Sequence, residues 1–368
     1  MNNRKLTLST LFLALCLSNT VLADEASPSV QTKVLNGQNA SALAENLLPW
    51  QAAILTKPNF RDNVISGCGA VIISEHWVVT AAHCAEAAAN LSDTLVAGLT
   101  YIPQGKNKDL TAEYQFTIEQ KILHEGYKAS TSGTKSINAG DVDHDIALMR
   151  VQESLITVGK PIKIATAEEQ NQANTQFINT WNATGYSIGN LIASGWGDVA
   201  PSFKPSNELQ VVKLGGIPMS QCNSSYVTTS NSHFVCADSN NPAIKKDVCA
   251  GDSGGPLIWQ NPNKAGDADL GLRVIGVTSN GPNCRFKNAG YLASQSNGLY
   301  TELASYRDWI ETKTGLTLDN IATSDFSHDP FKVVREDEHV STGGSSGGSV
   351  PLAALLGLVL TGLLRRRC

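Results

Sequence analysis

The sequence predicts an all-β protein, organised either as one large β domain or as two smaller ones. Its 368 residues, of which 42% are hydrophobic and 17% charged, suffice to bury a core of that size. Runs of β-branched residues such as 71–73 and 77–80 are interrupted by short turns, which is typical of strands. The net charge of −5 argues against nucleic acid as a partner, because a nucleic-acid-binding protein needs a basic face.

The N-terminal residues predict a secretory signal peptide that is not part of this core. Arg4 and Lys5 precede an apolar run, and the small residues that end at Ala23 suit a cleavage site. The run is too short for a comfortable membrane span. A lipoprotein signal ending at Cys16 is the alternative. Leu15 argues against it, because leucine is large for the position before a modified cysteine.

The C-terminal residues predict a second export signal. A Gly/Ser string over 342–349 is followed by an apolar run over 350–364 and then by three arginines. A helix of that run spans roughly 22 Å, less than the roughly 30 Å of hydrocarbon in a bilayer, and the arginines would stay on the cytoplasmic side. A permanent tail anchor is one interpretation. The pattern also resembles the GlyGly-CTERM sorting tail of Gram-negative bacteria, which implies passage through the periplasm, a transient inner-membrane tether, cleavage by a rhomboid-type sortase and type II secretion.

A glycine-rich stretch in the second half of the chain carries the strongest functional signal. Ser253 lies in Gly-Asp-Ser-Gly-Gly-Pro, which spans 251–256, and glycines allow a sharp turn that other residues resist. Such a turn can aim the amides of Gly251 and Ser253 into one concavity, where they would stabilise a developing negative charge. The string resembles the nucleophile motif of trypsin-like serine proteases, a family with the chymotrypsin fold.

The same resemblance supplies the two partners of this serine. His83 lies in Thr-Ala-Ala-His-Cys, which matches the general-base motif of the family, so the resemblance makes His83 the base. Asp145 precedes an apolar run, and Asp-Ile-Ala-Leu resembles the strand that bears the triad carboxylate. We therefore expect Asp145, rather than Asp141 or Asp143, to orient His83. The intervening His144 is expected to be incidental.

The resemblance also implies the architecture, which is two six-stranded antiparallel β-barrels with the active site between them and a C-terminal helix. Apolar residues at helical spacing between 303 and 310 fit that helix. Beyond it the chain becomes polar and acidic, which predicts a mobile linker. The predicted organisation is a signal peptide over 1–23, an activation propeptide over 24–33, a first barrel over 34–160, a second barrel with the C-terminal helix over 161–315, a polar and Gly/Ser linker over 316–349 and a sorting tail over 350–368.

The cysteines predict disulfides formed in an oxidising compartment. Of the eight cysteines, Cys16 and Cys368 lie in the two terminal signals, and the even number that remains favours pairing. The sequence alone leaves the pairing open. No Cys-x-x-Cys pair accompanies them, so a structural metal site is not indicated, and the resemblance implies no metal or organic cofactor. The pairs that the resemblance implies are Cys68–Cys84, Cys222–Cys236 and Cys249–Cys284.

The residues around Lys33 predict activation by proteolysis. Val34-Leu-Asn-Gly resembles the first residues of a mature trypsin-like protease. Cleavage after Lys33 by an activating protease would release the α-amino group of Val34, which could turn inward and pair with Asp252. Asn36 departs from the glycine that the family has at this position. Lys33 as an ordinary linker residue is the alternative.

The substrate pocket can be located by position relative to the nucleophile motif. Asp247 stands where trypsin-like members carry the carboxylate at the base of the pocket, and a buried carboxylate requires a cationic partner such as a substrate lysine or arginine. A solvated loop aspartate is the alternative. Val248 replaces a common serine whose hydroxyl contacts lysine, so we expect arginine to be preferred over lysine. The resemblance makes Gly281 and Gly298 the pocket walls and pairs Ser279 with the substrate backbone.

Together these motifs cover roughly residues 34–315 and predict a secreted trypsin-like serine endopeptidase, made as a zymogen, that cleaves after arginine or lysine. A catalytically silent binding protein with the same fold at the cell surface is the alternative. Such proteins normally lose a triad residue, whereas His83, Asp145 and Ser253 are all present. An esterase is less consistent with Asp247, because a neutral ester needs no buried carboxylate.

Overall fold

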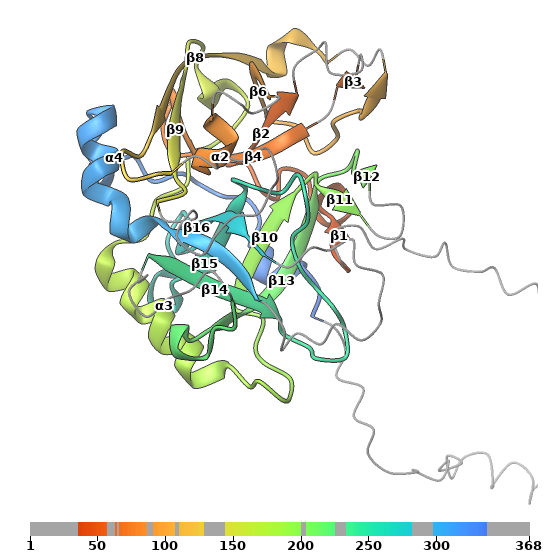
Figure 1. The fold of residues 1–368 in the computed structure, drawn as a ribbon, viewed down its shortest axis with the longest axis vertical. Coiled ribbons are helices and arrows are strands. Elements are labelled where there is room, and N and C mark those ends of the chain that lie inside the picture. Colours follow the sequence, from red (N-terminus) through yellow and green to blue (C-terminus); the bar gives the residue numbers. More distant parts are fainter. Residues whose placement is uncertain are drawn as a thin grey trace, which may run out of the picture. The chain divides into compact units, whose positions relative to one another are not determined.

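Strands dominate the computed structural model of the chain, as the runs of β-branched residues predict (Figure 1). They pair in antiparallel order within two closed sheets, so the predicted pair of six-stranded barrels is confirmed. The structure describes residues 36–56, 63–64, 66–86, 91–106, 110–128, 144–199, 204–224, 233–281 and 297–336.

The first barrel consists of six strands in the order β2-β4-β5-β9-β8-β6, and it closes because β2 pairs with both β4 and β6. Inward side chains such as Ile54, Val78 and Leu95 are fully buried in one apolar cluster. These strands are β2 (Gln51–Thr56), β4 (Ser66–Ile72), β5 (Trp77–Thr80), β6 (Leu91–Ala97), β8 (Gln115–Leu123) and β9 (Ala147–Val151).

The second barrel is a seven-stranded sheet in the order β1-β13-β10-β15-β16-β17-β14, in which β14 also pairs with β13 and so closes six of the strands. The remaining strand, β1 (Gln38–Asn39), precedes the first barrel in sequence but pairs with β13 of the second. The closed strands are β10 (Leu191–Gly195), β13 (Gln210–Ile217), β14 (Phe234–Ser239), β15 (Pro256–Gln260), β16 (Leu272–Asn280) and β17 (Gly298–Glu302).

Short helices and ribbons fill the connections. The longest described helix, α3 (Ala167–Thr180), was not predicted, although it starts with a capping box in which Thr166 and Glu169 bond to each other's backbone. The other elements are α1 (Ala40–Leu43), α2 (Ala82–Ala85), β3 (Asn63–Val64) paired with β7 (Gly105–Lys106), β11 (Asp198–Val199) paired with β12 (Lys204–Pro205), and the 3₁₀ helices η1 (Ala112–Tyr114), η2 (Leu155–Thr157), η3 (Met219–Gln221) and η4 (Pro262–Lys264).

The C-terminal helix forms where the apolar spacing predicts it. A 3₁₀ turn, η5 (Leu303–Tyr306), continues into α4 (Arg307–Thr314), and Gly315 ends the helix with a left-handed φ of 72°. Tyr306 and Ile310 are buried. Beyond its start on the second barrel, α4 also reaches the first, because Trp309 Nε1 donates to Glu125 after β8 at 2.9 Å.

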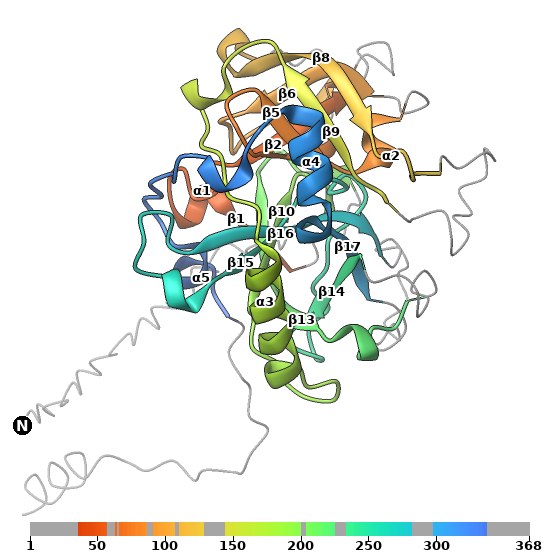
Figure 2. The same ribbon diagram turned by 90° about the vertical axis from the view of Figure 1, so that its left-hand side faces the viewer.

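Residues 316–336, called the C-terminal extension here, do not form the mobile linker that their polarity predicts. The extension carries η6 (Leu318–Asn320) and α5 (Pro330–Val333), and Figure 2 shows α5 beside β15. Leu318, Phe326 and Val334 are buried in the main apolar cluster. The prediction was wrong for this part because three widely spaced apolar residues are enough to dock a segment whose average composition is polar.

Two predicted disulfides, Cys68–Cys84 and Cys222–Cys236, are confirmed. Cys249 is also disulfide-bonded, and its predicted partner Cys284 lies outside the described residues. The predicted signal peptide, propeptide and sorting tail lie outside them as well. Within the described ranges, no helix has the length and apolar character needed to cross a membrane.

Candidate active site

Asp145 lies just before β9, and hydrogen-bond donors enclose its carboxylate. Its Oδ1 accepts the backbone N–H of His83 at 2.9 Å, and its Oδ2 lies 2.8 Å from His83 Nδ1. Ser279 Oγ, from β16 of the second barrel, donates to Oδ2 at 2.7 Å. Burial opposes ionisation, but the charge of His83 and these hydrogen bonds prevail, so the pKa of Asp145 lies below its ordinary value. Asp145 is therefore a buried anion directed at His83.

His83 lies in α2, the single helical turn that follows β5. Its side chain is 35% exposed, whereas that of Asp145 is 4% exposed. Because Nδ1 faces the carboxylate, the neutral imidazole carries its proton on Nδ1, and Nε2 is then the basic nitrogen. The sequence Thr-Ala-Ala-His-Cys thus places a base at the edge of the first barrel.

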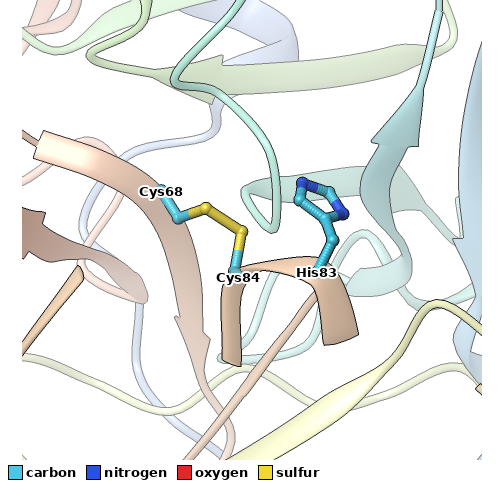
Figure 3. Close-up of side chains that lie close together, drawn as sticks. All are labelled: Cys68, His83 and Cys84. Carbon is cyan, nitrogen blue, oxygen red and sulfur yellow. A yellow bond between two sulfur atoms is a disulfide. The ribbon is translucent and has the colours of Figure 1, made fainter. Parts of the chain in front are cut away.

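Two cysteine sulfurs lie close to this histidine, as Figure 3 shows. Ligand atoms of Cys68, His83 and Cys84 lie within 4.8 Å of one another, and one histidine with two cysteines is a donor set that can hold zinc. Here the two sulfurs are joined in a disulfide and cannot ligate as thiolates. The disulfide therefore joins α2 covalently to β4, and the cluster does not fit a metal site.

The loop that carries Ser253 approaches this helix through glycine backbone. Gly251 and Gly254 have φ values of 99° and 76°, which other residues rarely adopt. A Cβ added at Gly254 would lie 2.5 Å from the carbonyl oxygen of Gly69. The amide of Gly69 donates to the carbonyl of Ser253 at 2.7 Å, and Cys84 Sγ lies 3.6 Å from the same carbonyl oxygen. Ser253 is thereby fixed next to the segment that carries His83.

The amides of Gly251 and Ser253 are available to a ligand. Neighbouring amides are used internally, since Asp252 donates to Cys249 and Gly254 donates to Thr278. Neither the amide of Gly251 nor that of Ser253 donates to an acceptor in the described part of the chain. Two unused, half-buried amides on one tight turn can stabilise an oxyanion.

Asp247 is a buried carboxylate at the position that the sequence predicts for the base of the substrate pocket. The residue is only 2% exposed, which excludes the solvated loop aspartate. Its Oδ1 accepts the amide of Val248 at 2.8 Å, and its Oδ2 is buried with no hydrogen-bond partner among the described residues. A Cβ added at Gly298 would lie 3.4 Å from Oδ1 and one added at Gly281 would lie 3.5 Å from Gly298 Cα. The structure therefore brings the three predicted pocket residues together.

A second buried carboxylate, which interacts electrostatically with Asp247, was missed by sequence reasoning. Asp238 in β14 accepts a hydrogen bond from Asn297 Nδ2 at 2.8 Å, and burial raises the pKa of Asp238 to about 6. Burial, together with Coulomb repulsion from Asp238, raises the pKa of Asp247 well above its usual range. The only signal in the sequence is an aspartate that directly follows the apolar run 234–237. A cation placed beside these two buried carboxylates would favour their ionised forms and so lower both pKa values.

Asp252, the predicted activation carboxylate, is completely buried. It accepts the amides of Gly197 and Cys249, each at 2.8 Å, which lower its pKa, yet burial, together with Coulomb repulsion from Asp198, raises that pKa to about 6. Lys33 and Val34 lie outside the described residues. Asn36 adopts a φ of 58°, a left-handed conformation that asparagine tolerates better than other non-glycine residues. Its replacement of the family glycine is therefore explained.

His144 is part of an aromatic cluster that the sequence did not reveal. Its ring stacks on His124 with 4.4 Å between centroids, and its Nδ1 lies 3.0 Å from the hydroxyl of Tyr306. His144 also has a left-handed φ of 58°. The cluster fixes the backbone immediately before Asp145. The carbonyl of Asp145 itself accepts a hydrogen bond from Thr301 at 2.9 Å.

A histidine paired with a buried aspartate, beside a serine on a glycine turn, defines the class of chymotrypsin-fold serine hydrolases when two six-stranded barrels carry it. Comparison with known families identifies the family within this class. A family model described as Trypsin matches residues 35–310, so the chain belongs to the trypsin family of serine proteases, which are hydrolases acting on proteins or peptides.

Known proteases cover most of the chain. It is 28% identical over 309 residues to Kallikrein-1 of Mus musculus and 29% identical over 313 residues to renal glandular kallikrein of Mastomys natalensis, and each comparison covers 82% of this chain and 95% of the relative. Among solved structures it is similar to neuropsin, a serine protease expressed in the limbic system of mouse brain, with a TM-score of 0.50, 27% identity and coverage of 76% of this chain and 99% of neuropsin.

Proposed function

We propose that the chain is a serine endopeptidase in which Ser253 is the nucleophile, His83 the general base and Asp145 the carboxylate that orients the base. Ser253 Oγ attacks the peptide carbonyl while His83 Nε2 accepts its proton, and His83 then donates this proton to the leaving amine. The amides of Gly251 and Ser253 stabilise the oxyanion. The observation that carries the proposal is the hydrogen-bonded pair of Asp145 and His83.

For specificity, the proposal is cleavage after arginine or lysine, with arginine preferred. Asp247 has a buried oxygen without a partner among the described residues, and a cationic side chain would satisfy it. Val248 supplies no hydroxyl for an ammonium, whereas a guanidinium can use several donors at once. Gly281 and Gly298 form the walls, and Ser279 pairs with the substrate backbone.

The chain is further proposed to be a zymogen that an activating protease cleaves after Lys33. The new α-amino group of Val34 would then pair with Asp252. Support comes from the buried position of Asp252 and from Asn36, whose side chain bonds to the carbonyl of Lys245 at 2.7 Å and so anchors the start of the described chain beside the pocket.

Export is proposed from the two terminal signals. The signal peptide over 1–23 directs the chain to the periplasm of a Gram-negative bacterium. The tail over 350–368 tethers it transiently in the inner membrane until a rhomboid-type sortase cleaves it, and type II secretion releases the enzyme or leaves it at the cell surface. The supporting observation is the order of the Gly/Ser string, apolar run and arginines at the C-terminus.

One experiment tests these proposals together. The secreted protein is subjected to N-terminal sequencing and assayed on matched peptides that carry arginine, lysine or citrulline, the neutral analogue of arginine, before the cleaved bond. The expected result is an N-terminus at Val34, cleavage in the order arginine, lysine, citrulline, and no cleavage by Ser253→Ala. A Val34 N-terminus without Ser253-dependent cleavage would instead support the silent binding protein, which no present observation favours.

A further inference from the structure

The C-terminal extension lies outside the family match, which ends at residue 310, and yet it contacts both barrels. Phe326 packs edge-on against Trp50 at the start of the first barrel, with 4.9 Å between ring centroids. Ser324 Oγ donates to the carbonyl of Pro161, in the crossover between the barrels, at 2.6 Å. Gln260 of β15 donates to Asp329 at 3.0 Å. The extension is thus an ordered addition to the protease fold.

Its last two described residues, Arg335 and Glu336, contact β1 and Asn240, the residue that begins the segment 240–247. The backbone N–H of Arg335 donates to Gln38 Oε1, and Gln38 Nε2 donates to the carbonyl of Arg335, both at 3.2 Å. Gln38 belongs to β1, four residues after Val34. The side-chain amide of Gln38 thereby pairs with the extension as a neighbouring strand would.

Glu336 makes the contacts with the pocket side. One carboxylate oxygen lies 3.2 Å from Lys213 Nζ, and the other accepts hydrogen bonds from Tyr186 OH and, at 3.1 Å, from Asn240 Nδ2. Lys213 is 6% exposed and Asn240 is fully buried. A buried ammonium is costly without a partner, and Glu336 is the carboxylate that pairs with Lys213. The amide of Asn240 donates to Glu336 and also, at 3.3 Å, to the carbonyl of Ser187.

The side-chain amide of Asn240 links Glu336 to Lys246, the residue before Asp247. Because its Nδ2 donates to Glu336 and to the carbonyl of Ser187, its Oδ1 faces the opposite way and accepts the ammonium of Lys246 at 2.9 Å. Lys246 is 2% exposed and directly precedes Asp247 in sequence. The hydrogen bonds therefore run from Glu336 through Asn240 to Lys246, and Lys246 is joined to Asp247 by the peptide bond.

We propose that Glu336 is a positioning residue that holds the segment 240–247, and with it Asp247, in the geometry that a cationic side chain requires. The proposal rests on the function proposed above, because it assigns Glu336 to the same pocket. Glu336 acts on substrate binding and leaves the reacting groups His83 and Ser253 untouched.

The test measures cation binding near Asp247 and the reactivity of Ser253 separately, with two small probes on the secreted, activated enzyme. Benzamidine, an aromatic amidine with an arginine-like charge, measures the pocket through its inhibition constant Ki. Phenylmethylsulfonyl fluoride, which carries no cation and sulfonylates an activated serine, measures the triad through its rate of inactivation. The variants are Glu336→Ala, which removes every contact, and Glu336→Gln, which keeps an acceptor for Asn240 and folds more safely. Lys332→Ala, an exposed position of the same extension, is the control.

The expected result is a Ki for benzamidine that rises roughly tenfold in Glu336→Ala, the size of one lost buried hydrogen bond to a charged group, and less in Glu336→Gln. KM for an arginine peptide should rise in the same order. The sulfonylation rate and kcat should stay within about twofold of the parent, and Lys332→Ala should match the parent throughout.

Three results would overturn the proposal in distinguishable ways. An unchanged Ki with a lowered melting temperature in both Glu336 variants would leave Glu336 a purely structural residue. A sulfonylation rate that falls in parallel with Ki would show general damage to the site. Failure of the parent enzyme to bind benzamidine while sulfonylation proceeds would refute the cationic pocket itself, and the role of Glu336 with it.

Discussion

The hydroxyl of Ser279 should contribute to catalysis although it does not touch the reacting atoms. Asp145 is 3% exposed, so water cannot replace the 2.7 Å hydrogen bond from Ser279 Oγ to Oδ2. A hydrogen bond to a charged group contributes about 1.5–3 kcal/mol. If the loss is felt mainly in the transition state, when His83 is cationic, kcat of Ser279→Ala should fall roughly 10- to 100-fold. KM should hardly change, because the backbone of residue 279 is intact.

The control for this variant lies next to it on β16. Thr278 Oγ1 is buried and has no hydrogen-bond partner among the described residues, so Thr278→Val removes a hydroxyl of similar size without removing a bond. Both variants are assayed for kcat and KM on one arginine peptide, with active sites titrated by the sulfonyl fluoride. A Ser279→Ala enzyme with the kcat of Thr278→Val would refute the idea that the third donor keeps Asp145 and His83 aligned.

Four further predictions concern specificity, pH and stability. Asp247→Asn should lower kcat/KM for arginine peptides on the order of a hundredfold or more and leave citrulline peptides unaffected; equal losses would contradict the pocket assignment. In the uncut Ser253→Ala protein, the pKa of about 6 for Asp252 exceeds its usual 3.8, so its stabilising proton is present below about pH 4 and is lost as pH rises through about 6. The free energy of unfolding should fall by on the order of 3 kcal/mol over this pH range, and thermal unfolding should show this fall in the uncut form but not after cleavage. If the melting temperature depended on pH in the same way in both forms, the pairing of Val34 with Asp252 would be contradicted. Activity of the cleaved enzyme should fall in alkali as the Val34 amine loses its proton; the ordinary pKa of such an amine is roughly 7.7–8.0, and the proposed pairing with Asp252 should raise it. A form with a blocked amine should not show this alkaline loss of activity. Thr278→Val should raise the free energy of unfolding by about 1 kcal/mol, because a buried unpaired hydroxyl is removed; an unchanged or lower melting temperature would contradict it.

The active-site geometry could be predicted because each key residue lies in a contiguous motif. Asp145 was distinguished from Asp141 and Asp143 by the apolar strand after it, and the structure places it against His83. The position of Asp247 follows equally from its spacing to Ser253. Local sequence sufficed in these cases because a turn or strand end fixes where the side chain points.

Residues whose importance depends on long-range pairing could not be predicted. Asp238 meets Asn297 only because Ala237 of β14 pairs with Gly298 of β17, a register that neither segment encodes alone. Likewise, Glu336 lies in a segment of low average hydrophobicity, and its contacts with Lys213 and Asn240 follow from the docking of Phe326 and Val334 upstream. Composition averages hide such isolated anchors.

The contact between Gly69 and the Ser253 loop determines whether one barrel of this chain can be combined with the opposite barrel of a relative. A Cβ at Gly69 would lie 2.7 Å from Gly255 Cα, so at this point one barrel is aligned on the other by main chain against main chain. Side-chain packing elsewhere at the junction can diverge without moving the nucleophile relative to the base. Hybrid proteases that join a barrel of this chain to the opposite barrel of a relative should therefore keep a working triad, provided that the glycines on both sides of the junction are inherited with their barrels.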